Sequence, residues 1–437
     1  MGGGQAHAAL ESTIVNGAHD FLWGVSASAF QIEGAADLRE PSVWDAFTAR
    51  RDRIKDGSNA SVATDHYHRY REDVALMREL GVGAYRFSVS WPRVLSGDLD
   101  FYERLVDELL AAGITPVPTL YHWDTPVELD WVDRDTAFRL ADYASVVGAK
   151  LADRVPMWIT INEPAEVTLL GYGLGQHAPG KQLLFDALPV AHHQLLAHGL
   201  AVQALRAAGA GNIGIAVSHT PVWTAGDTQA DRDSAGLYDL LMNWLFADPL
   251  LLGRYPEGFE QGEPGDMEII SSPLDWYGIN YYSPTLVGAP GDGVESFSGF
   301  DLPADLPFGI REIEGYPLTG FGWPVVPDGL HEMITQLRDR YGEHLPPIYV
   351  TENGCAYPDA VEDSRRIEFL DGHVKALRRA MSEGADVRGY FVWSIMDNFE
   401  WIEGYTQRFG LVHVDFDTLR RTPKSSYFWY RDLIRGA

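Results

Sequence analysis

Residues 157–164 read MWITINEP, an apolar and β-branched run that ends on Asn162 and Glu163. A run of this composition predicts a buried strand. Seven other short runs share its character. They begin at Phe21 (FLWGVSAS), Ala84 (AYRFSVSW), Thr115 (TPVPTLYHW), Asn212 (NIGIAVSHT), Trp276 (WYGINYY), Ile348 (IYVTENG) and Gly389 (GYFVWSIMDN). The chain is therefore expected to contain eight principal strands.

Helical patterns separate these predicted strands. Apolar residues recur there at three- and four-residue spacing, as one face of a helix requires. The clearest are at residues 71–81, 100–113, 136–153, 331–342 and 365–384. Strands that alternate with helices predict parallel strands joined by crossover helices.

The number of strands favours a closed (β/α)₈ barrel, the TIM barrel, over an open doubly wound sheet. An open sheet would carry a Gly-rich phosphate turn after an early strand, and none follows the first predicted strands. No linker divides the chain, so we expect one catalytic domain over residues 1–437. Residues 1–19 are expected to be a flexible amino-terminal extension. Residues 287–320, rich in Gly, Pro and Asp, are expected to be a loop inserted after the sixth strand.

The charge of the chain excludes some partner classes. It contains 62 Asp and Glu against 34 Lys and Arg, a formal charge of −28. This excess opposes binding to nucleic acid or to anionic membranes. A small-molecule ligand is the expected partner, and a homo-oligomer remains open.

The cellular compartment is expected to be the cytoplasm. The single Cys355 cannot form an intrachain disulfide, and the amino terminus lacks the basic start and apolar core of a signal peptide. No run approaches transmembrane length.

Polar residues collect where the predicted strands end, which is where barrel enzymes place their chemistry. Taken singly, each has an ordinary structural role, such as a helix cap or a core histidine. Their repetition at successive strand ends predicts a site. They are Gln31, Arg86, His122, Asn162, Glu163, Asn280, Tyr282, Glu352, Asn353 and Trp393, followed by Asp397, Glu400 and Trp401.

Glu163 and Glu352 end the fourth and seventh predicted strands, so they would face each other across the barrel mouth. The structural alternative is that both carboxylates cap the helices that follow. Glycoside cleavage needs one carboxylic acid to protonate the leaving oxygen and one carboxylate at the anomeric carbon. The pair therefore indicates a glycosidase, and the distance between the two carboxyl groups would decide retention or inversion.

The chain resembles glycoside hydrolase family 1, of the bacterial β-glucosidase type, over nearly its whole length. The resemblance rests on motifs in a fixed order: FLWGVSASAFQIEGA, YRFSVSWPRVL, LYHWDTP, ITINEP, GINYY, IYVTENG, YFVWSIMDNFEW and RFGLVHVDF. It implies a retaining β-glycosidase that hydrolyses β-D-glucosides, with β-fucosides and β-galactosides as further substrates. It implies no cofactor.

The resemblance also implies roles for residues. Glu163 would be the acid/base and Glu352 the nucleophile, kept ionised by Arg86 and Tyr282. The remaining motif positions would hold the sugar, with Trp393 as the platform under its ring. They are Gln31, His122, Asn162, Asn280, Tyr282, Glu400, Trp401 and Phe409.

Two histidine pairs, His66 with His68 and His192 with His193, suggest metal binding. Neither pair has the spacing of a known catalytic metal site, so we expect no metal.

The sequence departs from the family pattern at several places expected to lie on the cleft rim. The loop after Leu95 is short, only Trp131 remains of a common Gly-Gly-Trp stretch, and Ala165 stands where Trp usually follows NEP. Altered binding of the aglycone, including a bulky natural-product group, is one expected consequence, and simple drift of the loops without a functional effect is the alternative.

Other functions remain open on the sequence. One is transglycosylation, and another is a sugar-binding barrel without activity, which the retention of both glutamates opposes. A 6-phospho-β-glycosidase is a third, but Glu400 would repel the phosphate.

Overall fold

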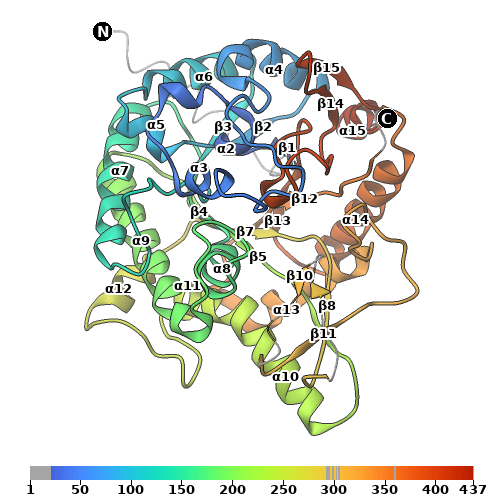
Figure 1. The fold of residues 1–437 in the computed structure, drawn as a ribbon. Helices are drawn as coiled ribbons and strands as arrows, with labels where there is room; N and C mark the ends of the chain where they lie inside the picture. The colour runs from blue at the N-terminus through green and yellow to red at the C-terminus, as the bar shows by residue number, and fades with distance from the viewer. Residues whose placement is uncertain are drawn as a thin grey trace.

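Eight parallel strands close into a barrel, in the order β1-β13-β12-β7-β5-β4-β3-β2 (Figure 1). This computed structural model describes residues 21–291, 296–297, 300–301, 303, 306–358 and 361–436. The predicted extension at residues 1–19 lies outside them. The barrel strands are β1 Leu22–Ser26, β2 Ala84–Ser88, β3 Thr115–Tyr121, β4 Trp158–Asn162, β5 Ile213–Ser218, β7 Trp276–Asn280, β12 Ile348–Asn353 and β13 Val387–Trp393. All eight predicted strands and the predicted (β/α)₈ barrel are confirmed.

Helices surround the barrel and cover its outer face (Figure 1). The five helices predicted from apolar spacing are present, as α4 His66–Leu80, α6 Asp100–Ala111, α7 Asp135–Leu151, α13 Pro327–Tyr341 and α14 Ser364–Ser382. The other helices are α2 Ala29–Ile32, α3 Val43–Thr48, α5 Trp91–Leu95, α8 Pro164–Glu166, α9 Leu188–Ala207, α10 Gln229–Asp239, α11 Leu245–Leu252, α12 Asp266–Ile270 and α15 Ser425–Ile434. Short 3₁₀ turns occur at η1 Ala36–Leu38, η3 Leu184–Ala187, η5 Gly342–His344 and η6 Trp401–Glu403, and π-helical turns at η2 Val167–Gly173 and η4 Leu240–Trp244.

Helix α9 had no clear amphipathic signal because it is buried on most of its surface. It packs against α7, where a side chain at Gly148 would lie 3.0 Å from Ala208. The glycine-rich stretch at residues 209–214 runs from just after α9 into the first residues of β5. It leads into a strand, so it does not form the phosphate turn of a doubly wound fold.

Two apolar layers hold the barrel together. One lies between the strands and the helices, and the other fills the barrel interior. In the interior, Gly214 leaves the space that the Trp276 ring occupies, since a Cβ there would lie 2.4 Å from the indole. Because side chains fill the interior, a ligand can bind only at the mouth of the barrel.

The segment that follows β7 contributes strands as well as loop. In its described part, β8 Thr285–Gly288 pairs antiparallel with β11 Gly309–Arg311 and parallel with β6 Val222–Thr224. Short strands β9 Ser296–Phe297 and β10 Phe300–Asp301 pair with each other, and the rest of residues 287–320 lies partly outside the described residues. A hairpin of β14 Val412–Asp415 and β15 Arg420–Pro423 follows the last barrel strand.

Over the described residues, no helix has the length and apolar character needed to cross a membrane.

Candidate active site

A cavity of about 280 Å³ opens at the carboxyl ends of the barrel strands. Nine of the residues predicted from the sequence line it: His122, Glu163, Asn280, Tyr282, Glu352, Trp393, Glu400, Trp401 and Phe409. Gln31, Arg86 and Asn162 lie directly beneath, at most 1% exposed, and reach the lining residues through hydrogen bonds. The barrel therefore brings these twelve residues together. Of the other strand-end residues, Asn353 lies outside the lining, where its amide donates to the Tyr281 carbonyl at 2.8 Å, and Asp397 lies in a separate charged network.

Glu163 follows β4 and caps α8 with a left-handed backbone, φ 47°. This conformation is unfavourable for a residue with a side chain and persists only where the surroundings fix it. Its amide donates to the Ala216 carbonyl of β5 at 2.8 Å. Burial, then the negative charges of Glu352 and Glu166, raise the pKa of Glu163 well above its usual value. Glu163 is therefore suited to carry a proton near neutral pH.

Glu352 has a different environment, because each of its oxygens receives a hydrogen bond. Arg86, from β2, donates to Oε1, and the Tyr282 hydroxyl donates to Oε2 at 2.6 Å. Arg86 also donates to the Thr351 carbonyl at 3.2 Å, which fixes its guanidinium beside the strand. A charged donor and a phenol both favour the carboxylate as their acceptor.

The amide of Asn162 connects the two glutamates. Its oxygen accepts from Arg86 and, at 2.9 Å, from Asn280, while its nitrogen donates to Oε2 of Glu163 at 3.2 Å. The same nitrogen lies 3.1 Å from Nε2 of His122. Burial, and then the charge of Arg86, hold the pKa of His122 well below its usual value, so this imidazole is neutral.

Gln31 and Glu400 form a polar pair on the side of β1 and β13. The Gln31 amide donates to Oε2 of Glu400 at 3.2 Å and to the Phe399 carbonyl at 3.0 Å. Burial, then the charges of Glu352 and Glu403, raise the pKa of Glu400 to about 8. A ligand whose hydroxyl groups donate to this carboxyl group would favour its ionised form.

Flat rings border this polar pair. The His122 ring is stacked against Trp393 at 5.7 Å and against Trp401 at 6.0 Å between centroids. Phe30 supports Trp401 from the other side, at 5.9 Å and 7°. Aromatic faces beside hydroxyl-binding groups are suited to a sugar ring, which has apolar C–H faces and polar edges.

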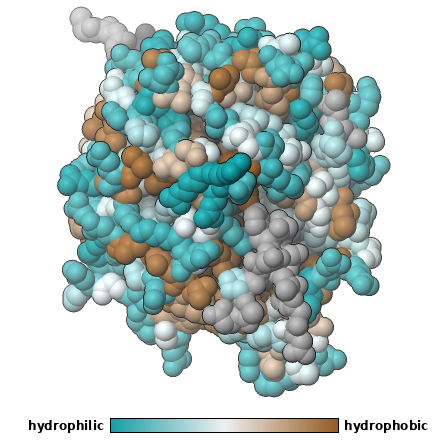
Figure 2. Space-filling model, in the orientation of Figure 1, coloured by the Kyte–Doolittle hydropathy of each residue, from teal (hydrophilic) through white to brown (hydrophobic). Residues whose placement is uncertain are grey.

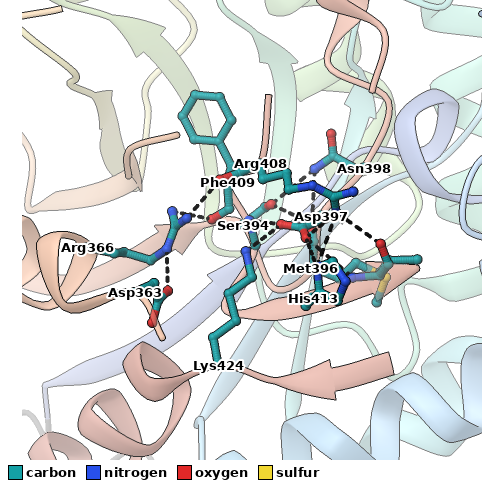
Figure 3. A network of polar contacts seen from close by, with 12 residues as sticks. Asp363, Arg366, Ser394, Met396, Asp397, Asn398, Arg408, Phe409, His413 and Lys424 are labelled. Atoms are coloured by element: carbon teal, nitrogen blue, oxygen red, sulfur yellow. Dashed lines mark hydrogen bonds and ion pairs between the residues drawn. The ribbon is translucent and has the colours of Figure 1, made fainter. Parts of the chain in front are cut away.

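A buried charged network fixes the loop that carries Glu400 (Figure 3). Asp397 pairs with Lys424 at 2.7 Å and with Arg408 at 2.9 Å, and it lies 3.2 Å from His413. Burial opposes ionisation, but these cations hold the pKa of Asp397 well below its usual range. The adjacent Asn398 accepts from the Gln31 amide at 3.1 Å, so the network reaches the site through one residue.

The histidine pairs have protein partners. His66 bonds Asp73 at 2.7 Å, and His192 lies 2.8 Å from both Tyr255 and Asp266. Among the described residues, no group of three or more His, Cys, Asp or Glu side chains has the arrangement of a metal site.

The expectation that the sequence departures lie on the cleft rim is wrong for two of them. Trp131 is fully buried, where its indole donates to Tyr121 at 3.0 Å and to Thr125 at 3.1 Å. Ala165 is also fully buried. Neither residue lines the cavity.

Several lining residues lie outside the set predicted from the sequence, among them Trp123, Glu166, Phe321 and Trp323. Trp123 adjoins His122 in the same motif, and Glu166 lies one helical turn after Glu163. Because His122 and Glu163 were predicted site residues, their proximity in the sequence could have indicated that Trp123 and Glu166 also line the site. Phe321 and Trp323 come from the long segment after β7 and carry no such signal.

The site combines a carboxyl group with a raised pKa, a second carboxyl group with fixed donors, and a polar pocket with aromatic walls. Two carboxyl groups in contrasting environments can divide acid and nucleophile roles at one anomeric centre.

Comparisons with known proteins agree with this chemistry. The family model described as Glycosyl hydrolase family 1 matches residues 16–437. Beta-glucosidase A of Acetivibrio thermocellus is 40% identical, over 95% of this chain and 98% of the relative. A bifunctional beta-D-glucosidase/beta-D-fucosidase of Bifidobacterium breve is 41% identical, over 95% and 97%. The crystal structure of a psychrophilic beta-glucosidase from Micrococcus antarcticus superimposes with a TM-score of 0.91, at 43% identity, over 97% and 98%.

Proposed function

Since this chain belongs to glycosyl hydrolase family 1, we propose that it is a retaining β-glucosidase acting by double displacement. In the first step the Glu352 carboxylate attacks the anomeric carbon while Glu163 protonates the leaving oxygen, which forms a covalent glycosyl-enzyme. In the second step Glu163, now ionised, takes a proton from water, and that water displaces Glu352 from the sugar.

One observation carries this proposal: Asn162 bonds Glu163 directly and Glu352 only through Arg86, and the two carboxyl groups have opposite environments. Glu163 has its pKa raised by burial and neighbouring negative charge, whereas Glu352 receives donors on both oxygens. A nucleophile must be ionised and an acid must be protonated at the same pH, and this difference supports that division. If the two carboxylates only capped helices, no difference between their protonation states would be required.

The proposed sugar site uses the polar pair and the rings. Gln31 and Glu400 would bind adjacent hydroxyl groups, with Trp393 under the ring. His122 would accept or donate at the opposite edge. Their support is the 3.2 Å hydrogen bond from Gln31 to Glu400 and the stacking of His122 on Trp393.

We extend the proposed substrates to β-D-fucosides, since a relative at 41% identity is named for both activities. Compared with a glucoside, a D-fucoside lacks the hydroxyl group on its sixth carbon and has its fourth hydroxyl axial, so both bonds proposed to Glu400 would change while the other proposed contacts remain.

The function is tested with p-nitrophenyl β-glucoside, β-fucoside, β-galactoside and 6-phospho-β-glucoside, with proton NMR to follow the first-formed sugar. We expect the unphosphorylated glucoside or fucoside to be preferred and the β-anomer to appear first. A preference for the 6-phosphoglucoside, or an α-anomer as first product, would exclude the proposal.

A cytoplasmic location is part of the proposal. Its support is Cys355, the one cysteine in the chain, which is fully buried and has its pKa raised to about 12 by burial. Such a thiol offers no disulfide to stabilise a secreted enzyme. Activity measured in separated cell fractions tests the location.

A further inference from the structure

The cavity has two unlike sides. Four of the proposed sugar-binding residues, Gln31, Trp393, Glu400 and Trp401, come from β1, β13 and the segments that follow them. In the closed ring, β5 lies opposite β1, with β4 and β7 on either side of it. Segments that follow these three strands supply the other wall, beyond Glu163. The group leaving the anomeric carbon receives its proton from Glu163, so this second wall faces the aglycone.

The aglycone wall is mainly apolar. Its side chains come from η2 and the residues after it, from η4, and from the segment after β8. Its apolar side chains are those of Leu169, Leu170, Leu174, Leu241, Met242 and Phe308. On the face shown in Figure 2, apolar residues gather in the lower half, over the region where Figure 1 shows α8 and α11.

This wall is packed from behind. Phe308 meets Tyr238 of α10 edge to face, at 5.2 Å between ring centroids. Phe308 and Met242 also pack on the small cluster that contains Val287 of β8. A second sugar would bring hydroxyl groups against this surface, and each hydroxyl without a partner would weaken binding. An apolar aglycone avoids that loss.

A single carboxyl group interrupts the apolar wall. Glu166 lies one turn after Glu163, and its amide donates to the Glu163 carbonyl at 3.1 Å. Its side chain lines the cavity, and Oε1 accepts from the Ser218 hydroxyl at 3.1 Å. Over the described residues, the only partner of this carboxyl group is that hydroxyl, and no Lys or Arg pairs with it.

The neighbouring charge that shifts the pKa of Glu166 belongs to another carboxylate. Burial, and then the charge of Glu352, raise its pKa to about 7, while Ser218 opposes the shift. Glu166 in turn contributes to the raised pKa values of Glu163 and Tyr238, after burial in both cases. This partly buried carboxyl group faces a cavity beside another carboxylate and, among the described residues, lacks a compensating cation. A cationic ligand would supply it.

We propose that Glu166 selects an aglycone that is apolar and carries an ammonium group, with the ammonium against its carboxylate and the apolar part against Leu170, Leu241 and Phe308. This inference rests on the proposed β-glucosidase activity. Glu166 is a specificity-determining residue that contacts the leaving group, whereas the bond-breaking proton comes from Glu163. The acidity of the whole chain, with a formal charge of −28, favours a cationic ligand in the same direction.

The test compares alkyl, ω-hydroxyalkyl and ω-aminoalkyl β-D-glucosides of matched chain length, with p-nitrophenyl β-glucoside as the reference for activity. In the wild type we expect kcat/KM to rise with alkyl length, by about fourfold per methylene group. At the best length, the aminoalkyl glucoside should exceed the alkyl glucoside by about ten- to a hundredfold, the range of a charge-assisted hydrogen bond.

The variants Glu166→Gln and Glu166→Leu are compared through the ratio of aminoalkyl to alkyl kcat/KM on the same enzyme. This ratio cancels any effect of the substitution on Glu163. We expect the ratio to fall to one or below in both variants. Glu403→Gln is the matched control, because Glu403 lines the same cavity but pairs with Lys55 at 2.9 Å. Its ratio should equal that of the wild type.

The outcomes separate the two proposals. If p-nitrophenyl β-glucoside is not hydrolysed, the proposed function fails and the inference with it. If that substrate is hydrolysed but the wild type shows no gain for the aminoalkyl series, the inference is wrong and the function stands. An equal gain for hydroxyalkyl glucosides overturns the ammonium assignment, as does a ratio unchanged in Glu166→Gln.

Discussion

The hydroxyl of Tyr282 donates to Oε2 of Glu352 at 2.6 Å, and among the described residues this phenol is the only neutral donor on that carboxylate. Arg86 occupies the other oxygen. Because the two donors come from β2 and from the residues after β7, the carboxylate is fixed from both sides of its own strand, β12. Its orientation toward the cavity therefore depends on contacts that span most of the chain.

Tyr282→Phe should lower kcat/KM for p-nitrophenyl β-glucoside by about ten- to a hundredfold, since a hydrogen bond to a charged group contributes about 1.5–3 kcal/mol. Removal of one hydroxyl leaves the ring in place, so the melting temperature should stay near that of the wild type. Steady-state kinetics and thermal unfolding check both. Unchanged kinetics would mean that Arg86 alone orients Glu352.

Glu352→Ala should nearly abolish turnover, and added azide should restore it with an α-glucosyl azide as product. A small anion can occupy the space of the missing carboxylate and attack the same face of the sugar. The product is identified by NMR. A β-azide would instead assign azide to the position of the water, and Glu352 would lose its role as nucleophile.

Glu163→Ala should preserve kcat/KM for dinitrophenyl β-glucoside and strongly reduce it for an alkyl β-glucoside, because only the poor leaving group needs protonation. The pKa of Glu163 is raised, so the acid form exists below that pKa and is lost as the pH rises through it. The wild type should therefore lose alkyl glucoside activity on the alkaline side. In Glu163→Gln that alkaline limb should be absent for the dinitrophenyl substrate. Equal losses for both leaving groups would remove Glu163 from the acid role.

Glu400→Gln should reduce kcat/KM for glucosides by about ten- to a hundredfold, since its carboxylate is proposed to accept two hydroxyl groups of the sugar. A xyloside lacks the sixth carbon and its hydroxyl group, so its rate should fall less. Kinetics with glucoside, xyloside and 6-phosphoglucoside check this. A uniform decline with a lower melting temperature would indicate that Glu400 only supports the loop.

Asp397→Asn should destabilise the fold by about 3–5 kcal/mol, because it leaves the buried Lys424 and the partly buried Arg408 without their anion. The pKa of Asp397 is lowered on folding, so its stabilisation exists above the unfolded value of about 3.9 and is lost as the pH falls below it. Wild-type stability should therefore drop more steeply than that of the variant under acid conditions. Urea unfolding at several pH values measures this.

Asp371→Asn is the matched control for that experiment. Asp371 pairs with Lys375 on the surface at 2.6 Å, and the two side chains are 43% and 72% exposed. Its effect should stay within about 0.5 kcal/mol. A comparable loss in both variants would show that burial of the Asp397 network carries no special stability.

The sequence by itself determined the eight strands and the positions of Glu163 and Glu352. Whether a segment forms a strand depends mainly on residues close together in the sequence. Glu163 and Glu352 each lie at or near the end of such an apolar segment. The same holds for α4, α6, α7, α13 and α14, whose buried faces repeat with the helical period. The motifs then identified the family, because both their residues and their order can be read from the sequence alone.

Only the tertiary structure decided how those residues meet. Asn162 forms hydrogen bonds with Arg86, Asn280 and Glu163 across three strands, and the spacing of these residues in the sequence does not predict those contacts. In the folded chain, Trp131 is fully buried, and β8 pairs with β11 in a segment that was expected to be a loop. Glu166 faces the cavity, and among the described residues no cation pairs with it. The physical reason is the closure of the barrel: β1 pairs with β13, so side chains hundreds of residues apart become neighbours, and their burial and charge are properties of the closed ring.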